Sequence, residues 1–316
     1  MLIGAIKNEI EKLYFKKRIH VVIGIVLFFT LLMVTLSYFD KDNEDPIDWQ
    51  ITIEEQITGI ESRLTTINNQ SSDEYMNLVN QKEKLNFQLK NDINPEVSGA
   101  TGDLASSVTG VFIKLILPVL IVILTADLIV GETSNGTMKS LLVSPLGRKK
   151  IILSKFLASL IISIGVMLLS NVLTYITSIP FYGLGSWNDL IVIGNENFKA
   201  IPIWEYILYG LGLNMVTIIT LISVVILISV LFETVTTSVS LSLSLIVFGG
   251  LLGNLQSTLE VLKYFFILNL DLVSNIIGES TVHNTTFLVS LLTMLITMLL
   301  CFLLSFSIFS KKDMLI

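Results

Sequence analysis

The fold class follows from an apolar run near the N-terminus, HVVIGIVLFFTLLMVTLSYF, from His20 to Phe39. The run contains no Asp, Glu, Lys or Arg, and about 20 such residues allow a helix to cross the hydrocarbon core of a bilayer. The basic residues Lys16, Lys17 and Arg18 precede it, as in a secretory signal peptide. However, the run is longer than a usual signal core and no small-residue cleavage site follows it. We therefore expect a retained transmembrane helix.

The composition of the whole chain also favours a membrane protein. Of the 316 residues, 52% are hydrophobic and 15% are charged, and the mean hydropathy is +0.77. These values lie outside the ordinary range of soluble globular proteins. Two His and one Cys offer little material for a metal site or a disulfide framework. We expect no metal site, no catalytic residue and no nucleic-acid partner, and we interpret Cys301 as a packing residue.

Six apolar segments predict an all-α integral membrane protein with about six transmembrane helices. A short helix in the segment between the third and fourth spans is also compatible with its sequence. The predicted divisions are an amphipathic interfacial helix at 1–19, spans at 20–39, 109–130, 151–178, 207–232, 235–255 and 287–309, an extracellular helical hairpin at 40–108, a cytoplasmic loop at 131–150, an extracellular loop at 179–206, an extracellular or re-entrant segment at 256–286, and a cytoplasmic tail at 310–316.

The distribution of charge predicts the orientation. Twelve of the 20 basic residues fall before the first span, between the second and third, or after the sixth. About 20 of the 26 acidic residues fall on the opposite side. Because basic residues collect in cytoplasmic loops, we expect both termini to be cytoplasmic. We expect the protein to lie in the cell membrane, which in a bacterium is the plasma membrane.

The N-terminal segment has the pattern of an amphipathic helix. Its apolar residues Ile3, Ile6, Ile10 and Leu13 are spaced to share one face. A helix of this kind lies in the membrane interface with its basic residues near anionic headgroups. The alternative is an ordinary charged flank that orients the first span. The basic residues predicted to lie at the interface are Lys7, Lys12, Lys16, Lys17 and Arg18.

The segment 40–108 shows helical periodicity in two stretches. Apolar residues recur every three or four positions in both stretches, which predicts two helices packed as an antiparallel hairpin. The hairpin is either a structural cap or a domain that receives a substrate. The residues of this apolar seam are Ile53, Ile57, Ile60, Leu64 and Ile67 in the first stretch and Leu78, Lys82, Leu85 and Leu89 in the second.

The middle of every predicted span lacks charge. Asp127 and Lys114 lie about one turn from opposite ends of the second span, and we expect them to reach water or to pair locally. Uncharged polar residues occupy the span centres instead, which argues against a proton relay and favours amphipathic or lipid-like cargo. The residues that we assign to a candidate substrate path are Asn171, Thr174, Asn214 and Thr217.

The segment between the second and third spans, Asp127 to Lys155, is the most informative part of the sequence. Gly136 and Pro145 punctuate about twenty residues that are too polar to insert into the membrane. Gly131 and Gly136 have the spacing of a phosphate-binding P-loop, but Thr137 stands where the lysine should be. We therefore expect no ATP binding by this chain itself. A cytoplasmic loop with a fixed shape usually contacts a partner.

The same segment resembles the signature of the ABC-2 type transporter permeases. The shared features are an acidic residue and a Gly-Thr pair after the second span, then Leu-Leu-x-Ser-Pro-x-x-Arg and a lysine that begins the third span. The start of the chain, with Lys7, Asn8, Glu9 and Lys12 before the first span, is also similar to that family. The positions that match the signature are Glu132, Gly136, Thr137, Leu141, Leu142, Ser144, Pro145, Arg148 and Lys155.

This resemblance implies a permease subunit of an ABC exporter. In the family, a permease pairs with an identical or homologous second permease and with two copies of a soluble ATPase, which binds the ATP and Mg²⁺. The loop between the second and third spans is the coupling element that seats on the ATPase. The resemblance thus assigns ATPase coupling to the loop 131–150. The long outer hairpin departs from the shortest members of the family, and the substrate class stays open among peptides, antibiotics, lipids and ions.

Three other function classes compete with this interpretation. A membrane sensor or immunity protein would bind a ligand through the outer hairpin without transport. A membrane-embedded enzyme would need paired acids or a Ser/His pair at membrane depth, whereas His20 and His283 lie at opposite span edges. A secondary transporter is disfavoured by the lack of midspan charge and of inverted repeats.

Overall fold

The structure is a computed structural model that describes residues 2–41, 49–67, 73–134, 147–194, 197–232, 234–253, 260–278 and 285–311. It is an all-α membrane protein, and six helical segments are long and apolar enough to cross a bilayer. The six predicted spans each overlap one of them. These segments are Arg18–Phe39, Gly99–Glu132, Arg148–Tyr182, Ile203–Leu231, Val235–Leu252 and Phe287–Lys311.

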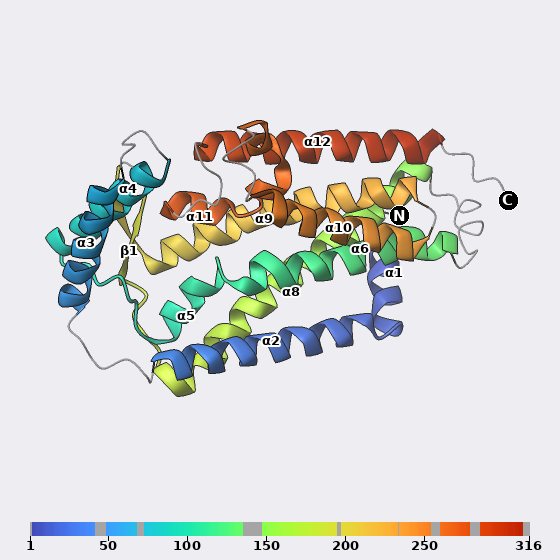
Figure 1. The fold of residues 1–316 in the computed structure, drawn as a ribbon. Helices are drawn as coiled ribbons and strands as arrows, with labels where there is room; N and C mark the ends of the chain where they lie inside the picture. Colours follow the sequence, from blue (N-terminus) through green and yellow to red (C-terminus); the bar gives the residue numbers. More distant parts are fainter. Residues whose placement is uncertain are drawn as a thin grey trace.

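The helices run roughly along one long axis, with three of them at the centre of the bundle (Figure 1). These are α6 (Leu117–Ser134), α8 (Arg148–Tyr182) and α9 (Ile203–Leu231). In the most apolar window of the span that contains α6, 72% of the residues are buried, compared with 22% for α2 (Arg18–Lys41) and 11% for α12 (Phe287–Lys311). The outer helices α2 and α12 therefore expose apolar side chains, as expected of surfaces that face lipid.

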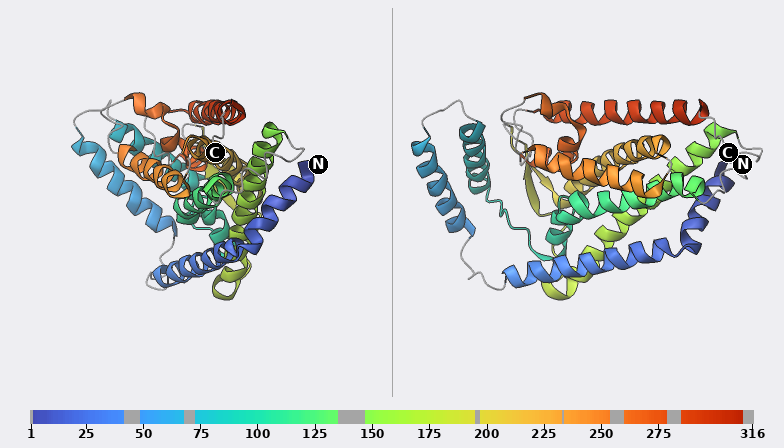
Figure 2. Two further views of the ribbon diagram at one scale, coloured as in Figure 1. Left: turned by 90° about the vertical axis from the view of Figure 1, so that its right-hand side faces the viewer. Right: turned by 45° about the vertical axis from the view of Figure 1, so that its right-hand side comes forward.

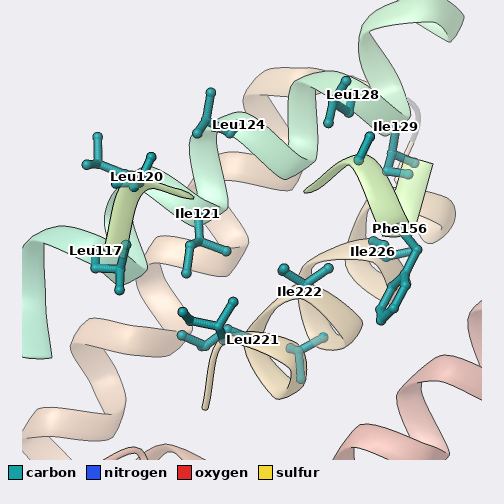
Figure 3. Close-up of a cluster of buried hydrophobic side chains, with 14 of the residues drawn as sticks. Leu117, Leu120, Ile121, Leu124, Leu128, Ile129, Phe156, Leu221, Ile222 and Ile226 are labelled. Atoms are coloured by element: carbon teal, nitrogen blue, oxygen red, sulfur yellow. The ribbon is translucent and has the colours of Figure 1, made fainter. Parts of the chain in front are cut away.

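The central contact joins α6 to α9. Ile121 of α6 points toward Leu221 and Ile222 of α9, with Leu117 on the same side of α6, whereas Leu124 points away from α9 (Figure 3). All five side chains are buried. Since both helices are apolar on all sides, close packing determines which faces meet.

The N-terminal helix α1 (Leu2–Phe15) is set at an angle to α2 and packs against α8 (Figure 2). Lys17, in the turn between them, has a φ of 57°, a left-handed conformation that changes the direction of the chain between α1 and α2. The predicted apolar face is confirmed for three of its four residues. Leu13 is buried and Ile6 and Ile10 pack on the core, whereas Ile3 is 82% exposed.

Helices α3 (Trp49–Thr66) and α4 (Asp73–Lys90) pack on each other at the end of the molecule away from α1 (Figure 1). The predicted seam is confirmed, because Ile53 and Ile60 of α3 bury against Leu78 and Leu85 of α4. Lys82, at the polar position of the seam, pairs with Glu61 of α3 at 2.6 Å. The predicted breaker between the two helices, 68–72, lies outside the described residues.

The predicted outer segment 40–108 is corrected by the structure, because its last part belongs to the bundle. Residues Gly99–Ser107 form α5, which packs on α8 and α9, and a π-helical turn η1 (Phe112–Ile116) joins it to α6. The start of α5 also lies close to the segment that follows α8, since a Cβ on Gly99 would lie 2.4 Å from the Cα of Gly185. Small residues add little hydropathy, so the apolar signal of the sequence begins later than the helix.

The segment 179–206, predicted as a loop in which a short helix could lie, contains strands instead. Helix α8 continues through Pro180 to Tyr182, and two strands follow, β1 (Leu190–Ile193) and β2 (Lys199–Pro202), paired antiparallel with Ile191 opposite Ile201. The β-branched residues Ile191, Val192 and Ile193 favour strand over helix. The ribbon lies beside α4 at the end of the bundle away from α1 (Figure 1).

The segment 256–286 folds back among the helices in its described part, 260–278. Two 3₁₀ turns, η2 (Glu260–Tyr264) and η3 (Phe266–Asn269), precede the short helix α11 (Leu272–Ile277), and η3 contacts α10 (Val235–Gly253) and α12. Most residues of η3 and α11 are buried. The short connection 232–234 joins α9 to α10, which pack on each other as predicted, with Glu233 outside the described residues.

Candidate functional site

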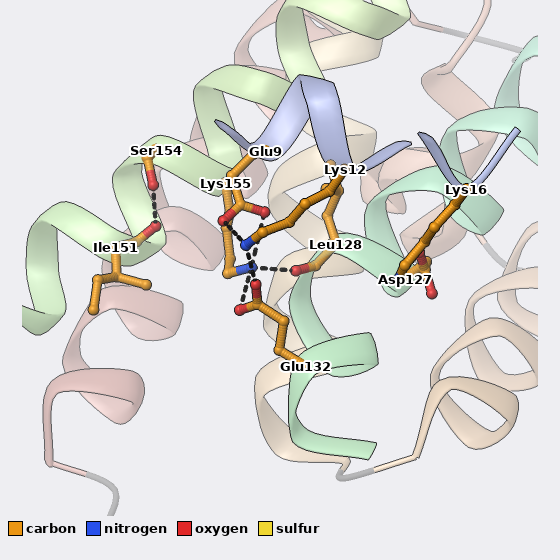
Figure 4. Close-up of polar contacts among 9 residues, drawn as sticks. All are labelled: Glu9, Lys12, Lys16, Asp127, Leu128, Glu132, Ile151, Ser154 and Lys155. Carbon is orange, nitrogen blue, oxygen red and sulfur yellow. Dashed lines mark hydrogen bonds and ion pairs between the residues drawn. The ribbon is translucent and has the colours of Figure 1, made fainter. Parts of the chain in front are cut away.

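A cluster of four charged side chains joins three helices at the end of the bundle where α1 lies (Figure 4). Glu9 and Lys12 come from α1, Glu132 from the end of α6, and Lys155 from the second turn of α8. Two carboxylates and two ammonium groups give a formal sum of zero. The undescribed segment 135–146 connects α6 to α8, so the cluster ties together the two helices that emerge from the predicted coupling loop.

Lys155 is the centre of this cluster. Its side chain is fully buried, and its Nζ lies 2.7 Å from Oε2 of Glu132 and 3.1 Å from Oε2 of Glu9. The same nitrogen donates a hydrogen bond of 2.6 Å to the carbonyl oxygen of Leu128. Three acceptors therefore use all three donors of the ammonium group, which is what a buried lysine requires to remain charged.

Lys12 completes the cluster from the partly exposed side. Its Nζ pairs with Oε1 of Glu132 and lies 3.1 Å from Oε1 of Glu9. Burial opposes the charge of Lys12, but the hydrogen bond to Glu132 and the charges of both carboxylates outweigh it and raise the pKa of Lys12 above its ordinary value of 10.5. A raised pKa in the folded state means that this stabilisation is complete below pH 10.5 and is lost only as the pH rises through the higher value.

A second ion pair lies one helical turn before the cluster. The Asp127 carboxylate in α6 is buried, and its Oδ2 lies 2.8 Å from Nη1 of Arg18 and 3.6 Å from Nζ of Lys16. The expected local pairing of Asp127 is therefore present. Together with the four-residue cluster, this pair fixes the turn between α1 and α2 against α6.

The residues assigned to ATPase coupling fall into two groups in the structure. Glu132 and Lys155 meet directly, as described above. Arg148 lies at the start of α8 and donates to the carbonyl oxygen of Ser310 near the end of α12, at 3.4 Å. Gly136, Thr137, Leu141 and Pro145 lie outside the described residues.

The basic residues assigned to the membrane interface have different environments. Lys7 is more exposed than the other basic residues that form ion pairs here. It pairs with Glu11 at 3.7 Å on the outer face of α1. Lys12, Lys16 and Arg18 instead bind carboxylates of α6. Lys17 is exposed in the turn. The basic face of α1 thus has an internal function, in fixing α1 to the bundle, in addition to any contact with headgroups.

The residues assigned to a substrate path make hydrogen bonds inside the chain. Asn171 of α8 accepts a bond of 2.9 Å from Ser107 of α5, and Thr174 donates within its own helix. Asn214 donates to the carbonyl oxygen of Val108 at 3.0 Å, and Thr217 to that of Leu270 at 2.9 Å. Three of these four residues therefore link neighbouring elements.

Lys114, at the other end of the second span, also pairs locally. Its Nζ lies 2.7 Å from Oδ2 of Asp271 and 3.2 Å from Oγ of Ser274. Asp271 caps α11 by accepting from the backbone N–H of Ser274 at 3.1 Å. This ion pair holds the segment 260–278, which folds back among the helices, against the π-helical turn η1.

Lys114→Met should lower the free energy of unfolding by about 1 kcal/mol, since Lys114 is partly exposed and water screens the pair. The expected measurement is a detergent-induced unfolding curve of the purified protein, with Lys90→Met, an exposed substitution on α4, as the control. Asp271→Asn should cost less than Lys114→Met because an amide oxygen still caps α11. An unchanged curve for Lys114→Met would contradict this role.

Two participating residues were not assigned to these sites from the sequence. Glu9 belongs to the similarity at the start of the chain, but its buried partner Lys155 is 146 positions away in sequence. Asp271 lies in a segment whose depth the sequence left open. The local signal for Glu9 was its spacing of three residues from Lys12, which allows an ion pair on one helix face.

Comparisons with known proteins give one family and one relative. Residues 63–315 match the model of a family described as "Protein of unknown function (DUF2705)". An uncharacterized protein, YhcI, of Bacillus subtilis (strain 168) is 23% identical over 203 residues, which cover 61% of this chain and 63% of that protein. The chain therefore spans less than two thirds of the length of this curated relative, and neither description specifies an activity.

Proposed function

Since the chain belongs to this family of unknown function, we propose its activity from its own residues. We propose that it is the permease subunit of an ABC exporter. The substrate is amphipathic, a peptide, an antibiotic or lipid-like. A separate ATPase supplies the energy by contacting the loop 131–150. The permease pairs with a second, identical or homologous permease in a bacterial plasma membrane. The resemblance of Glu132, Arg148 and Lys155 to the ABC-2 signature supports this assignment.

The observation that carries the proposal is the buried cluster of Glu9, Lys12, Glu132 and Lys155. A force applied to the loop 131–150 reaches α6 and α8 at the same time, because the loop is rooted in both. Glu132 and Lys155 join these roots, and Glu9 and Lys12 add α1 to the same unit. With a stiff connection of this kind, a partner ATPase that pushes on the loop moves the helices and does not merely bend the loop.

The orientation of the chain follows the same proposal. Helix α1 and the C-terminal end of α12 lie at one end of the bundle, and α3 and α4 lie at the other (Figure 1). The excess of basic residues at the first end favours the cytoplasm there. The hairpin of α3 and α4 is then extracellular, and the ATPase binds at the end where the cluster lies.

Arg148→Ala should abolish the stimulation of ATPase activity by substrate while leaving the fold intact. Arg148 is exposed at the start of α8, and substitutions of exposed residues usually change stability little. The test is ATP hydrolysis by the full complex in liposomes, with a soluble ABC ATPase that co-purifies with this chain. We expect stimulation to fall about tenfold or more, as for the loss of a charged interface contact of about 1.4 kcal/mol or more.

Lys90→Ala, an exposed basic residue at the hairpin end, is the matched control and should keep full stimulation. Substitution of Glu132 is a poorer test because it also disrupts the buried cluster. If the Arg148→Ala complex keeps normal stimulation, the loop assignment is wrong. If no ATPase binds the chain at all, the alternative of a sensor or immunity protein, which needs no ATPase, replaces the permease.

A further inference from the structure

A cavity of about 830 Å³ lies at the hairpin end of the molecule, far from the charged cluster. Its walls come from α4, α5, β1 and the end of α11. The volume falls within the range of about 300–1,000 Å³ that is typical of ligand sites. Both polar and apolar side chains line it, so its occupant should have both kinds of surface.

One wall of the cavity is the unpaired edge of β1. Ile203 donates its N–H to the carbonyl oxygen of Asp189 at 2.9 Å, which makes these residues a hydrogen-bonded pair. In an antiparallel ladder, hydrogen-bonded pairs alternate with non-hydrogen-bonded pairs. The backbone N–H and C=O groups of Ile191 therefore point toward β2, whereas those of Leu190 and Val192 point away from β2. Pro202, which has no N–H, stands opposite Leu190, a position where this register needs no N–H from it.

The free edge of β1 points toward α11 and the cavity. Gly194, on the same outward register as Leu190 and Val192, donates its N–H to the carbonyl oxygen of Ile276 at 2.7 Å. Leu190 and Val192 both line the cavity, and their outward N–H and C=O groups have no hydrogen bond to any residue that the structure describes. Groups of this kind are satisfied most fully by another extended backbone.

The facing wall is a row of amides on α4. Asn77, Asn80, Gln81 and Gln88 are spaced at helical intervals and all line the cavity. An amide side chain offers both a donor and an acceptor, which suits the alternating N–H and C=O groups of a peptide. The cavity therefore places groups that recognise backbone on two of its sides.

One buried carboxylate oxygen of the cavity lining has no hydrogen-bond partner among the residues that the structure describes. Oδ2 of Asp103, in α5, is buried and accepts no hydrogen bond within the described ranges. Glu96 adds a second negative charge to the lining. The lysine of the lining, Lys84, already donates to the carbonyl oxygen of Ile277 at 3.1 Å. A buried carboxylate oxygen without a donor favours a cationic group in the ligand.

We propose that this cavity binds an extended peptide segment that carries a basic side chain. The backbone of the peptide adds to the edge of β1, its amides meet the polar face of α4, and its lysine or arginine pairs with Asp103. A sugar or a lipid headgroup would satisfy the carboxylate but would not match the regular spacing of the strand edge. The site does not depend on whether an ATPase drives the chain, so it can be tested on the isolated protein.

The test uses the full chain in nanodiscs of phosphatidylcholine, a neutral lipid that does not attract basic peptides. The probe is a fluorescent hexapeptide of alternating lysine and valine with blocked ends, long enough to span the four residues of β1 with one residue to spare at each end. Fluorescence anisotropy measures binding. We expect saturable binding of this peptide and none of its glutamate-valine counterpart or of a version methylated at the backbone nitrogens.

Two variants separate the contributions of the carboxylate and the strand edge. Asp103→Asn should weaken binding about tenfold or more, because a charge-assisted hydrogen bond is replaced by a neutral one. Glu55→Gln, an equal change of charge on an exposed position of α3, should leave binding unchanged. Leu190→Pro removes the outward N–H and should abolish binding, whereas Leu190→Ala keeps that N–H and should retain it.

The outcomes decide the proposal. Equal binding of the lysine and glutamate peptides would overturn it, as would equal effects of Asp103→Asn and Glu55→Gln. Binding that survives both Leu190→Pro and backbone methylation would show that the strand edge is not used, and the occupant would then be a cation of another kind. Absence of binding at millimolar peptide, with the variants correctly folded by circular dichroism, would also overturn it.

Discussion

Lys155→Met lowers the free energy of unfolding by about 3–5 kcal/mol, the largest loss that we expect from a single substitution in this protein. The side chains are similar in length, so the loss arises from charge more than from packing. Glu9 and Glu132 would remain buried without the ammonium group that now lies within 3.1 Å of both. Unfolding of the purified protein with SDS in mixed micelles, followed by circular dichroism, measures the change.

Lys150→Met is the matched control, because Lys150 precedes Lys155 on α8 and is exposed. It should change the unfolding midpoint little. The double variant Lys155→Met with Glu132→Gln should be more stable than the sum of the two single effects predicts, since each substitution removes the charge that the other leaves unpaired. Additive effects of the two substitutions would show that the residues do not act as one cluster.

Gly249→Ala should lower the free energy of unfolding by about 1–3 kcal/mol through overpacking. A Cβ on Gly249 would lie 1.8 Å from Cγ2 and 2.6 Å from Cβ of Ile267, and both distances are too short for any side chain. Ile267 belongs to the 3₁₀ turn η3, which is buried between α10 and α12, so it has little room to move. The same unfolding assay measures the loss.

Gly250→Ala supplies the control from the adjacent position. A Cβ on Gly250 would have no atom within 4 Å from the other elements that the structure describes, and alanine favours helix over glycine by about 1 kcal/mol. Gly250→Ala should therefore be neutral or stabilising. If both substitutions destabilise equally, the position of η3 against α10 is different from that described above.

The sequence predicted the spans well because each needs only a sufficiently long apolar run. It also predicted the seam between α3 and α4, since periodic Ile and Leu residues determine a helix face wherever the helix lies. It failed at Gly99–Ser107, which is a buried helix of small and polar residues whose place depends on contact with α8. It also left 256–286 open, because the burial of η3 and α11 depends on helices distant in sequence.

The charged cluster was predicted in part. The signature resemblance singled out Glu132 and Lys155, and the amphipathic pattern singled out Lys12. Their mutual contacts, and the participation of Glu9, depend on how α1 folds back against α6 and α8, which no local pattern encodes. A lysine one turn inside an apolar helix is nevertheless a general sign that a carboxylate lies near it.

The zero formal charge of the cluster of Glu9, Lys12, Glu132 and Lys155 has an electrical consequence. Moving one elementary charge through the full membrane potential involves about 2.3 kcal/mol per 100 mV. A displacement of α1 with the ends of α6 and α8 as one unit carries no net charge in this cluster. The membrane potential would neither drive nor oppose the movement of these four side chains.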